Sequence, residues 1–349
     1  MPELDYLIVG QGIAGTAMAE TLIKRDLKIH VIDDWNFSSS SKVSAGLFNP
    51  MVFKRLNRSW MIDELLPVAE TFYSEMERKL NARFYYKKEL VKIIFEENER
   101  DFWLKKALDP VLKPYLSENI TTPFLPDEIN SPFGVGFVFK SGNVDVKKML
   151  LLYRDYLKSS NRLSDERFDY ARLRVGSESV EYKGLRAKKI IFCQGFRASE
   201  NPWFSWMKFK LSKGEILTIR CKLSLKDQFL VKGVFVVPFG EGTYKVGSTH
   251  NWEDLTENTT EKGKAELCEK LTKILKVPYT VIDQQAGVRP TVADRRPILG
   301  AHPENVVLTV FNGLGTKGTL LAPWFATHMA DFLSTGRGLL KEVDIGRFV

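Results

Sequence analysis

The sequence predicts an α/β fold in which a Rossmann-type dinucleotide-binding domain is interleaved with a smaller domain built on an antiparallel sheet (α+β). Buried-strand patterns at the start, middle and end of the chain predict the first domain, and a glycine-rich turn at 10–15 places a ligand in it. Segments rich in β-formers and bounded by Gly and Pro lie between those patterns and predict the second domain. The 349 residues suffice for two domains or one composite domain.

The opening of the chain predicts a β–α–β unit. Residues 4–9 are a short apolar run typical of a buried parallel strand, and residues 17–26 carry apolar side chains at helical spacing. Residues 28–33 form a second strand that ends at Asp33, and a polar loop of small residues is expected over 38–50. Further buried strands are predicted at 188–194 and 306–311.

The remaining patterns alternate between helix and strand. Helices are predicted at 60–81, 98–108, 260–276 and 320–334, and the segment 134–158 as a strand, a turn and a helix that starts near Asp145. Strand-like residues fill 84–95 and 209–250. From this order we expect an FAD- or NAD-type binding domain made of 1–82, 142–206 and 284–349, and a substrate domain made of 83–141 and 207–283.

The composition is that of an ordinary globular protein, with 44% hydrophobic and 27% charged residues, which excludes disordered and fibrous classes. No apolar run approaches the length of a membrane span, and the opening residues lack the pattern of a secretory signal peptide. The three cysteines are widely spaced, which argues against disulfides or a cysteine-based metal site. We therefore expect a cytoplasmic protein with no bound metal.

The net charge of +8 raises the question of an anionic partner. The basic residues are scattered, as in 54–58 and 208–213, and scattered charge is typical of solvated surface. Charge alone therefore favours a small-molecule substrate over nucleic acid, which stays an alternative.

Each glycine of the Gly10-x-Gly12-x-x-Gly15 turn has a physical task. Gly10 permits the tight turn, Gly12 lets the backbone approach a pyrophosphate, and Gly15 allows the helix to pack closely on the strand. The helix that follows presents free N–H groups and a positive potential to phosphates. We therefore expect a dinucleotide at Gly10, Gly12, Ile13, Ala14 and Gly15.

Acidic residues at the end of the second strand complete the dinucleotide site. The Asp33 carboxylate can accept hydrogen bonds from a ribose diol, and it disfavours a 2′-phosphate. Asp34 either shares this task or is a solvated loop acid. This pattern is common to FAD and NAD proteins, so another segment must distinguish the two cofactors.

The glycine-rich loop at 312–319 favours FAD. It lies between a buried strand and a helix, and the start of such a helix can face the pyrimidine edge of an isoalloxazine and stabilise the negative charge of the reduced ring. A helix start with several glycines and no ligand is the alternative. The flavin interpretation assigns to the cofactor Gly313, Leu314, Gly315, Thr316, Lys317, Gly318 and Thr319.

These segments resemble the D-amino-acid-oxidase-like FAD-dependent oxidoreductases, the family of glycine oxidase and sarcosine oxidase. The likeness follows nearly the whole chain in order: VGQGIAG with VID, SAGLFNP, GNVD, IIFCQGF, KGEIL, VVPF with YKVGST, GVRPTVADRRPILG and NGLGTKGTLLAP. The resemblance implies a non-covalently bound FAD. A C-terminal cysteine tethers the flavin in some relatives, and no cysteine follows Cys268 here.

The resemblance also implies roles for individual residues. It places Arg289 beside the flavin as a clamp for a substrate carboxylate, which suits the bidentate fork of a guanidinium; a structural ion pair with Asp294 is the alternative. Lys245 matches a lysine that lies near flavin N5 and favours oxygen reduction, with a solvent-facing strand lysine as the alternative. Along the pyrophosphate and flavin it places Ser41, Ser44, Ala45 and Gly46, with Gly195 near the adenine side.

The chain departs from the family pattern near the expected substrate. Phe235 stands where amino-acid oxidases often have a tyrosine, and Thr316-Lys317 stands where glycine oxidase has an arginine. The expected carboxylate clamp therefore has fewer of the groups that bind a carboxylate in those oxidases, which argues against a simple amino acid as substrate. His250 is either part of the site or an exposed loop residue.

The resemblance implies an enzyme that oxidises a CH–NH or CH–NH2 bond of a small amine or amino acid by hydride transfer to flavin N5, with oxygen or another electron acceptor. Such chemistry needs no acid–base dyad when the amine binds neutral, which agrees with the lack of a Ser–His–Asp or metal-ligand pattern. Two alternatives stay open. The last loop is also similar to an oxidase domain that acts on carboxymethylaminomethyl-modified tRNA uridine, and the protein could bind flavin without turnover.

Overall fold

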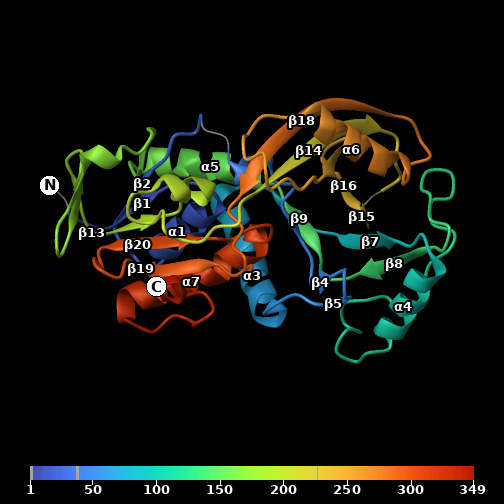
Figure 1. Ribbon diagram of the computed structural model, residues 1–349, viewed down its shortest axis with the longest axis horizontal. Coiled ribbons are helices and arrows are strands. Elements are labelled where there is room, and N and C mark those ends of the chain that lie inside the picture. The colour runs from blue at the N-terminus through green and yellow to red at the C-terminus, as the bar shows by residue number, and fades with distance from the viewer. Residues whose placement is uncertain (1–2, 37–38, 226) are drawn as a thin grey trace.

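The computed structural model describes residues 3–36, 39–225 and 227–349, and it has the mixed α/β fold that the sequence predicts. Two large sheets lie towards opposite ends of an elongated molecule (Figure 1). One sheet has eight strands and the other has seven. None of the helices within the described ranges is long and apolar enough to cross a bilayer.

The eight-stranded sheet has a parallel core. Neighbours in it are β10 (Leu163–Ser164), β2 (Ile29–Ile32), β1 (Glu3–Val9), β13 (Leu185–Phe192) and β20 (Leu308–Asn312). Antiparallel strands extend it at β11 (Leu173–Val175), β12 (Val180–Tyr182) and β19 (Ile298–Ala301). Because the carboxyl ends of parallel strands lie at one edge, the loops that follow β1, β2, β13 and β20 gather there.

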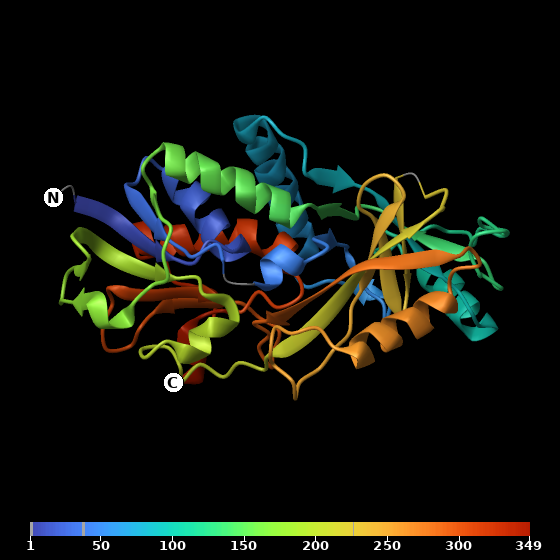
Figure 2. The ribbon, with the colours of Figure 1, turned by 90° about the horizontal axis from the view of Figure 1, so that it is seen from above.

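Helices cover this sheet. They are α1 (Ile13–Ile23), α5 (Val146–Ser159) and α7 (Gly318–Thr335), and α3 (Ile62–Leu80) packs in turn against α7 and α5. α1 contacts both α7 and α5, and α5 lies beside α1 when the molecule is seen from above (Figure 2). α1 is buried from Gly15 to Leu22, because α7 covers the side that the sheet does not. α5 begins after Asp145, whose side chain accepts a hydrogen bond from Lys148 N, as expected for an N-cap.

The seven-stranded sheet is antiparallel except where β15 and β7 run parallel. Its order is β18 (Tyr279–Arg289), β14 (Ser212–Cys221), β17 (Thr243–Gly247), β16 (Val234–Pro238), β15 (Gln228–Lys232), β7 (Glu89–Ile93) and β8 (Val135–Val138). α6 (Glu261–Thr272) packs against β14, β16 and β17, and α4 (Glu97–Ala107) lies at the far end of the molecule (Figure 1).

Short elements connect the two sheets. They are α2 (Ser40–Val43), β3 (Leu47–Phe48), β4 (Met51–Val52), β5 (Asn57–Arg58), β6 (Tyr85–Lys87) and β9 (Gly142–Val144). β9 lies between β3 and β6 in a three-stranded sheet, so three separate segments of the first half of the chain meet in it. Single turns of 3-10 helix, η1 (Tyr170–Arg172), η2 (Gly195–Glu200) and η3 (Ile345–Phe348), complete the fold.

The structure differs from the sequence expectation in three places. The loop expected over 38–50 contains the helical turn α2 and the strand β3, while Ser38 lies outside the described residues. Helix α7 begins at Gly318 rather than at residue 320, inside the glycine-rich loop. The expected domain boundary between 283 and 284 falls within β18, which stays paired with β14 as far as Arg289. Strand β18 therefore reaches from the seven-stranded sheet to the edge of the eight-stranded one.

Candidate functional site

A cavity of about 510 Å³ lies where the loops after β1, β2, β13 and β20 face the ends of β14 and β18. The structure brings together in its wall most of the residues singled out from the sequence: Gly10, Gly12, Ile13, Ala14, Asp33, Asp34, Ser41, Ser44, Ala45, Gly46, Gly195, Arg289, Leu314, Gly315, Thr316, Lys317, Gly318 and Thr319. Gly15, Gly313 and Lys245 are outside the wall. Phe235 and His250 belong to it.

The glycines of the first turn act through close packing. Gly10 has φ +100°, and a Cβ there would lie 2.6 Å from the carbonyl oxygen of Cys193 on the neighbouring strand. A Cβ on Gly15 would lie only 1.8 Å from the carbonyl oxygen of Gly10. Gly15 lies outside the cavity wall. Its lack of a side chain lets α1 approach the end of β1 closely, as the sequence predicts.

Two helices start at the cavity. α1 begins after Gly12 and α7 after Lys317, and neither helix has a side-chain hydrogen bond at its N-cap. The Ser41 hydroxyl accepts a hydrogen bond from Ile13 N at 3.2 Å. Among the described residues, Ser39 Oγ in the wall is buried without a partner. Two helix N-termini and an unsatisfied hydroxyl make a cavity that suits a polyanionic, hydrogen-bonding ligand.

The end of β2 carries Asp33, which is held from two directions. Asp33 Oδ2 accepts a hydrogen bond from Gln11 N at 2.8 Å, and Oδ1 accepts one from Arg154 of α5 at 2.8 Å. Asp34 also lines the cavity, and its Oδ1 accepts a hydrogen bond from Asn36 N. Gln11 and Arg154 were not predicted from the sequence. The glycine motif could have indicated Gln11, but nothing local to residue 154 points to Asp33.

Asn312 forms hydrogen bonds to both of the turns that follow β13 and β20. Its Nδ2 donates to the carbonyl oxygen of Gly195 at 2.8 Å, and its Oδ1 accepts from Gly313 N at 2.8 Å. Gly313 has φ +73° and lies against Ile298, so it shapes the turn behind the wall. Gly195 has φ +58°, and no atom lies within 4 Å of the position of a Cβ. The sequence analysis missed Asn312, although it opens the glycine-rich loop.

Arg289 ends β18 with its guanidinium in the cavity wall. NH2 donates to Ser248 Oγ at 2.7 Å and to Thr249 O at 3.3 Å, and NH1 donates to Lys213 O at 3.3 Å. NH1 also lies 3.5 Å from His250 Nδ1. Burial lowers the pKa of Arg289 to about 10.

The expected alternative, an ion pair between Arg289 and Asp294, is not formed. Asp294 Oδ2 accepts from Arg347 Nε at 2.9 Å instead. No carboxylate pairs with Arg289 in the part of the chain that the structure describes. A half-buried cation with neutral partners is costly, and an anion bound in the cavity would relieve that cost.

Lys317 is a second cation of the same kind. Its Nζ donates to Ser59 Oγ at 2.6 Å, and no carboxylate contacts it within the described ranges. Burial and the charges of Arg295 and Arg296 lower the pKa of Lys317 to about 8. Within the described residues, no carboxylate therefore pairs with either Arg289 or Lys317 in this cavity.

Lys245 lies behind the wall rather than in it. Its side chain is only 5% exposed, so the alternative of a solvent-facing strand lysine is wrong. Nζ lies 3.4 Å from the carbonyl oxygen of Ser44, a wall residue, and 4.2 Å from the centre of the Phe239 ring. Burial lowers the pKa of Lys245.

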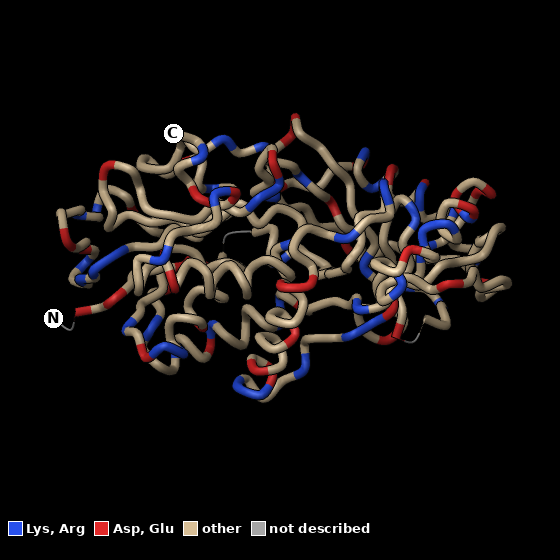
Figure 3. Tube along the Cα trace, turned by 90° about the horizontal axis from the view of Figure 1, so that it is seen from below, with Lys and Arg blue, Asp and Glu red and all other residues tan. Residues whose placement is uncertain are grey.

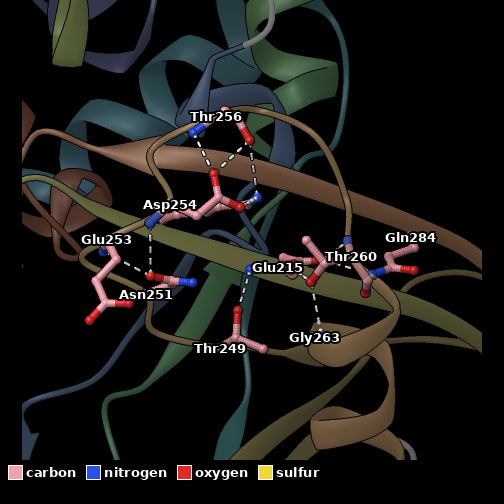
Figure 4. A network of polar contacts seen from close by, with 10 residues as sticks. Glu215, Thr249, Asn251, Glu253, Asp254, Thr256, Thr260, Gly263 and Gln284 are labelled. Atoms are coloured by element: carbon pink, nitrogen blue, oxygen red, sulfur yellow. Dashed lines mark hydrogen bonds and ion pairs between the residues drawn. The ribbon is translucent and has the colours of Figure 1, made fainter.

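The loop 248–260 supplies the acceptors that hold Arg289, and a polar network anchors this loop to β14 (Figure 4). Thr249 Oγ1 accepts from Glu215 N at 2.8 Å, and Glu215 accepts from Thr260 N at 2.9 Å and from Thr260 Oγ1 at 2.7 Å. Buried Lys213 pairs with Asp254 of the loop. At the loop's far side Glu257 pairs with Arg197, which lies in the cavity wall. The substrate-side loop is thus attached to both halves of the molecule.

The fold and this cavity define a dinucleotide-binding protein: a parallel sheet with a glycine-rich first turn, a carboxylate after the second strand, and a second sheet facing the cavity. The chain belongs to the FAD dependent oxidoreductase family, whose model matches residues 5–332. The cofactor of the family is FAD, and the residues present fit it, because the glycine cradle, two helix N-termini and the unpartnered Ser39 hydroxyl face one cavity.

Individual relatives are distant. Glycine oxidase of Bacillus licheniformis is 23% identical and covers 94% of this chain and 92% of its own. The crystal structure of glycine oxidase from Geobacillus kaustophilus superposes with a TM-score of 0.80 at 19% identity, covering 100% of this chain and 98% of that one. A tRNA 5-methylaminomethyl-2-thiouridine biosynthesis bifunctional protein of Marinobacter nauticus is 20% identical over 98% of this chain, which spans 58% of that protein.

Proposed function

We propose that this FAD-dependent oxidoreductase oxidises the C–N bond of a small amine or amino acid that carries a carboxylate. The observation that carries the proposal is the Arg289 guanidinium, which lies in the cavity wall with neutral partners only. FAD, when bound, would supply the two-electron acceptor for the oxidation of this bond. The similarity to glycine oxidase supports the same class of substrate.

Arg289 is suited to bind and orient a carboxylate. Its bonds to Ser248 Oγ, Thr249 O and Lys213 O fix the plane of the guanidinium and use three of its five N–H groups, which leaves Nε–H and one N–H of NH1 for a ligand. A carboxylate paired with it would be held in one orientation, which places the C–N bond of the substrate relative to the cofactor. Lys317 adds positive charge to the same cavity, which favours an anionic substrate or an anionic edge of the reduced cofactor.

Part of the cavity wall is apolar. Ile216 of β14 and Phe235 of β16 both line the cavity and restrict water near the reacting bond. No general base is required when the amine binds in its neutral form, so orientation, water exclusion and charge are the contributions of the protein. Lys245, buried behind Ser44, is proposed to provide positive charge for the reduction of oxygen or another acceptor.

Anaerobic reduction of the flavin tests this proposal. The purified protein is mixed without oxygen with a panel of amino acids and N-alkyl glycines, each paired with the corresponding amide that lacks the carboxylate. Bleaching of the visible flavin band by carboxylates, with weak or no bleaching by the amides, is expected. A flavin band that no donor in the panel bleaches would contradict the proposal and favour a flavin-binding protein without turnover.

A second candidate is an oxidase acting on a carboxymethylaminomethyl-type modified tRNA uridine. The full-length similarity to the Marinobacter nauticus protein and the NGLGTKGTLLAP loop favour it. The charge distribution disfavours it, because Lys and Arg alternate with Asp and Glu along the molecule (Figure 3). A tRNA mobility-shift assay decides: binding at low salt that weakens steeply with ionic strength supports this candidate, and no binding at low salt excludes it.

A further inference from the structure

A buried arginine stands directly behind the carboxylate at the end of β2. The side chain of Arg154, on α5, is 4% exposed, and Arg154 is not part of the cavity wall. Its NH1 donates to Asp33 Oδ1 at 2.8 Å and to Gln11 Oε1 at 2.9 Å, and its NH2 donates to Asp33 O at 2.9 Å and to Asp165. One guanidinium therefore joins the glycine-rich turn, the end of β2 and α5.

These bonds determine which way Asp33 points. Gln11 N occupies one side of Oδ2 and Arg154 occupies one side of Oδ1. A carboxylate has about four acceptor positions, so about one position on each oxygen stays available. Asp33 lines the cavity and its side chain is 19% exposed, so those positions are available to a ligand.

The charge of Arg154 also matters. Hydrogen bonds to a charged acceptor are stronger than those to a neutral one, and Arg154 places its cation within hydrogen-bond distance of the Asp33 carboxylate. Asp165 in turn pairs with both Arg154 and Lys158.

We propose that Arg154 is a positioning residue for the adenosine ribose of FAD: it holds Asp33 in the orientation in which the two carboxylate oxygens accept the 2′- and 3′-hydroxyls. The rigid fork of the guanidinium is required because two of its bonds go to Asp33 itself, one to the carboxylate and one to the backbone carbonyl. The proposal rests on FAD as the cofactor and is independent of which bond the protein oxidises.

The test is a comparison of two ligands on the full-length chain freed of flavin. Dissociation constants are measured by flavin fluorescence for FAD and for the FAD analogue whose adenosine lacks the 2′- and 3′-hydroxyls. In the wild type, we expect the analogue to bind about 10- to 100-fold more weakly, since it loses hydrogen bonds to a charged acceptor. In R154Q, FAD itself should bind at least about tenfold more weakly, and the difference between the two ligands should fall below about threefold.

A general loosening of the protein would lower affinity for both ligands equally and leave their ratio unchanged, so the ratio separates positioning from a structural role. R25Q is the matched control. Arg25 pairs with Asp331 at 2.6 Å at the end of α1 remote from the glycine-rich turn, and its loss should leave the ratio at the wild-type value.

A ratio in R154Q equal to that of the wild type would overturn the proposal. Should R154Q not fold, R154K gives the same comparison, because lysine keeps the charge but cannot bond Asp33 Oδ1, Asp33 O and Gln11 together. D33N provides an independent reading: if it retained the full discrimination, Asp33 would not contact the ribose and the proposal would fail. None of these constants depends on finding a substrate.

Discussion

The guanidinium of Arg289 lies directly on the backbone of Gly214: a Cβ at residue 214 would lie 1.8 Å from NH2 and 2.3 Å from Cζ of Arg289. Gly214 is opposite Gly287 in the pairing of β14 with β18. A glycine at this position therefore lets the arginine fold back over β14, where Lys213 O, Ser248 Oγ and Thr249 O accept its hydrogen bonds.

Replacing Gly214 with alanine should displace the arginine without unfolding the protein. The group in the way is the end of a flexible side chain, so it moves while the strand stays. We expect G214A to raise KM for a carboxylate substrate by about 10- to 100-fold, the loss of one charged hydrogen-bonded pair, with little change in melting temperature. G338A, where no atom lies within 4 Å of the new Cβ, is the control. Unchanged KM in G214A would count against Arg289 as the clamp.

The lowered pKa of Lys317 should make the free energy of unfolding depend on pH. Its folded pKa of about 8 lies below the ordinary lysine value of 10.5, so its charged form is disfavoured in the folded state. The destabilisation is complete below pH 8 and fades as the pH rises from 8 towards 10.5. We expect K317M, in the flavin-free protein, to raise the free energy of unfolding by about 1–3 kcal/mol at pH 7. Urea unfolding at pH 7 and pH 10 checks this, and a gain as large at pH 10 as at pH 7 would contradict it.

The hydrogen bonds of Glu215 should contribute to the free energy of unfolding, because they anchor the loop 248–260. The buried carboxylate of Glu215 accepts from Thr260 and from Gln284 Nε2 at 2.6 Å (Figure 4). E215A should lower the free energy of unfolding by about 3 kcal/mol, since several donors lose a charged acceptor. E253A, an exposed acid in the same loop, should change it by less than about 0.5 kcal/mol. Equal effects of the two substitutions in denaturant titrations would show that the network does not anchor the loop.

Lys245 is proposed to act on the acceptor half of the reaction. K245M should slow reoxidation of the reduced enzyme by oxygen by at least about tenfold, because a buried cation next to developing negative charge is removed. The rate of anaerobic reduction by substrate should change much less, since Lys245 lies behind Ser44 and outside the cavity wall. Stopped-flow measurement of the two half-reactions checks both statements, and a selective loss in the reductive half would reverse the assignment.

Local patterns in the sequence pointed to residues of the glycine turn and to Asp33, which the structure places in one cavity wall. The glycine turn and Asp33 are local features of one β–α–β unit, and their spacing carries its own physical explanation. The sequence could not indicate Arg154, because an arginine on an amphipathic helix is typical of solvated surface and its partner Asp33 is 121 residues away.

The buried charged residues of the seven-stranded sheet could not be predicted from the sequence either. Lys213 and Glu215 lie in β14 among β-forming residues, and only the fold places Asp254 and Thr260 beside them. The length of β18 was also not predicted. Only Ala286–Val288 of this strand are buried, so residues 279–285 lack the pattern of a buried strand. Arg289 was singled out by resemblance. The sequence could not show that Asp294 forms no ion pair with it, because Asp294 pairs instead with Arg347, which is 53 residues away.

The most direct test of the account is anaerobic flavin reduction by a matched carboxylate and carboxamide substrate in the wild type and in R289M. If Arg289 binds the carboxylate, the wild type should prefer the carboxylate by about 100-fold or more in kcat/KM, and R289M should lose that preference while still binding FAD. A preference that survives in R289M, with FAD bound and the protein folded, would contradict the assignment of Arg289 as the substrate clamp.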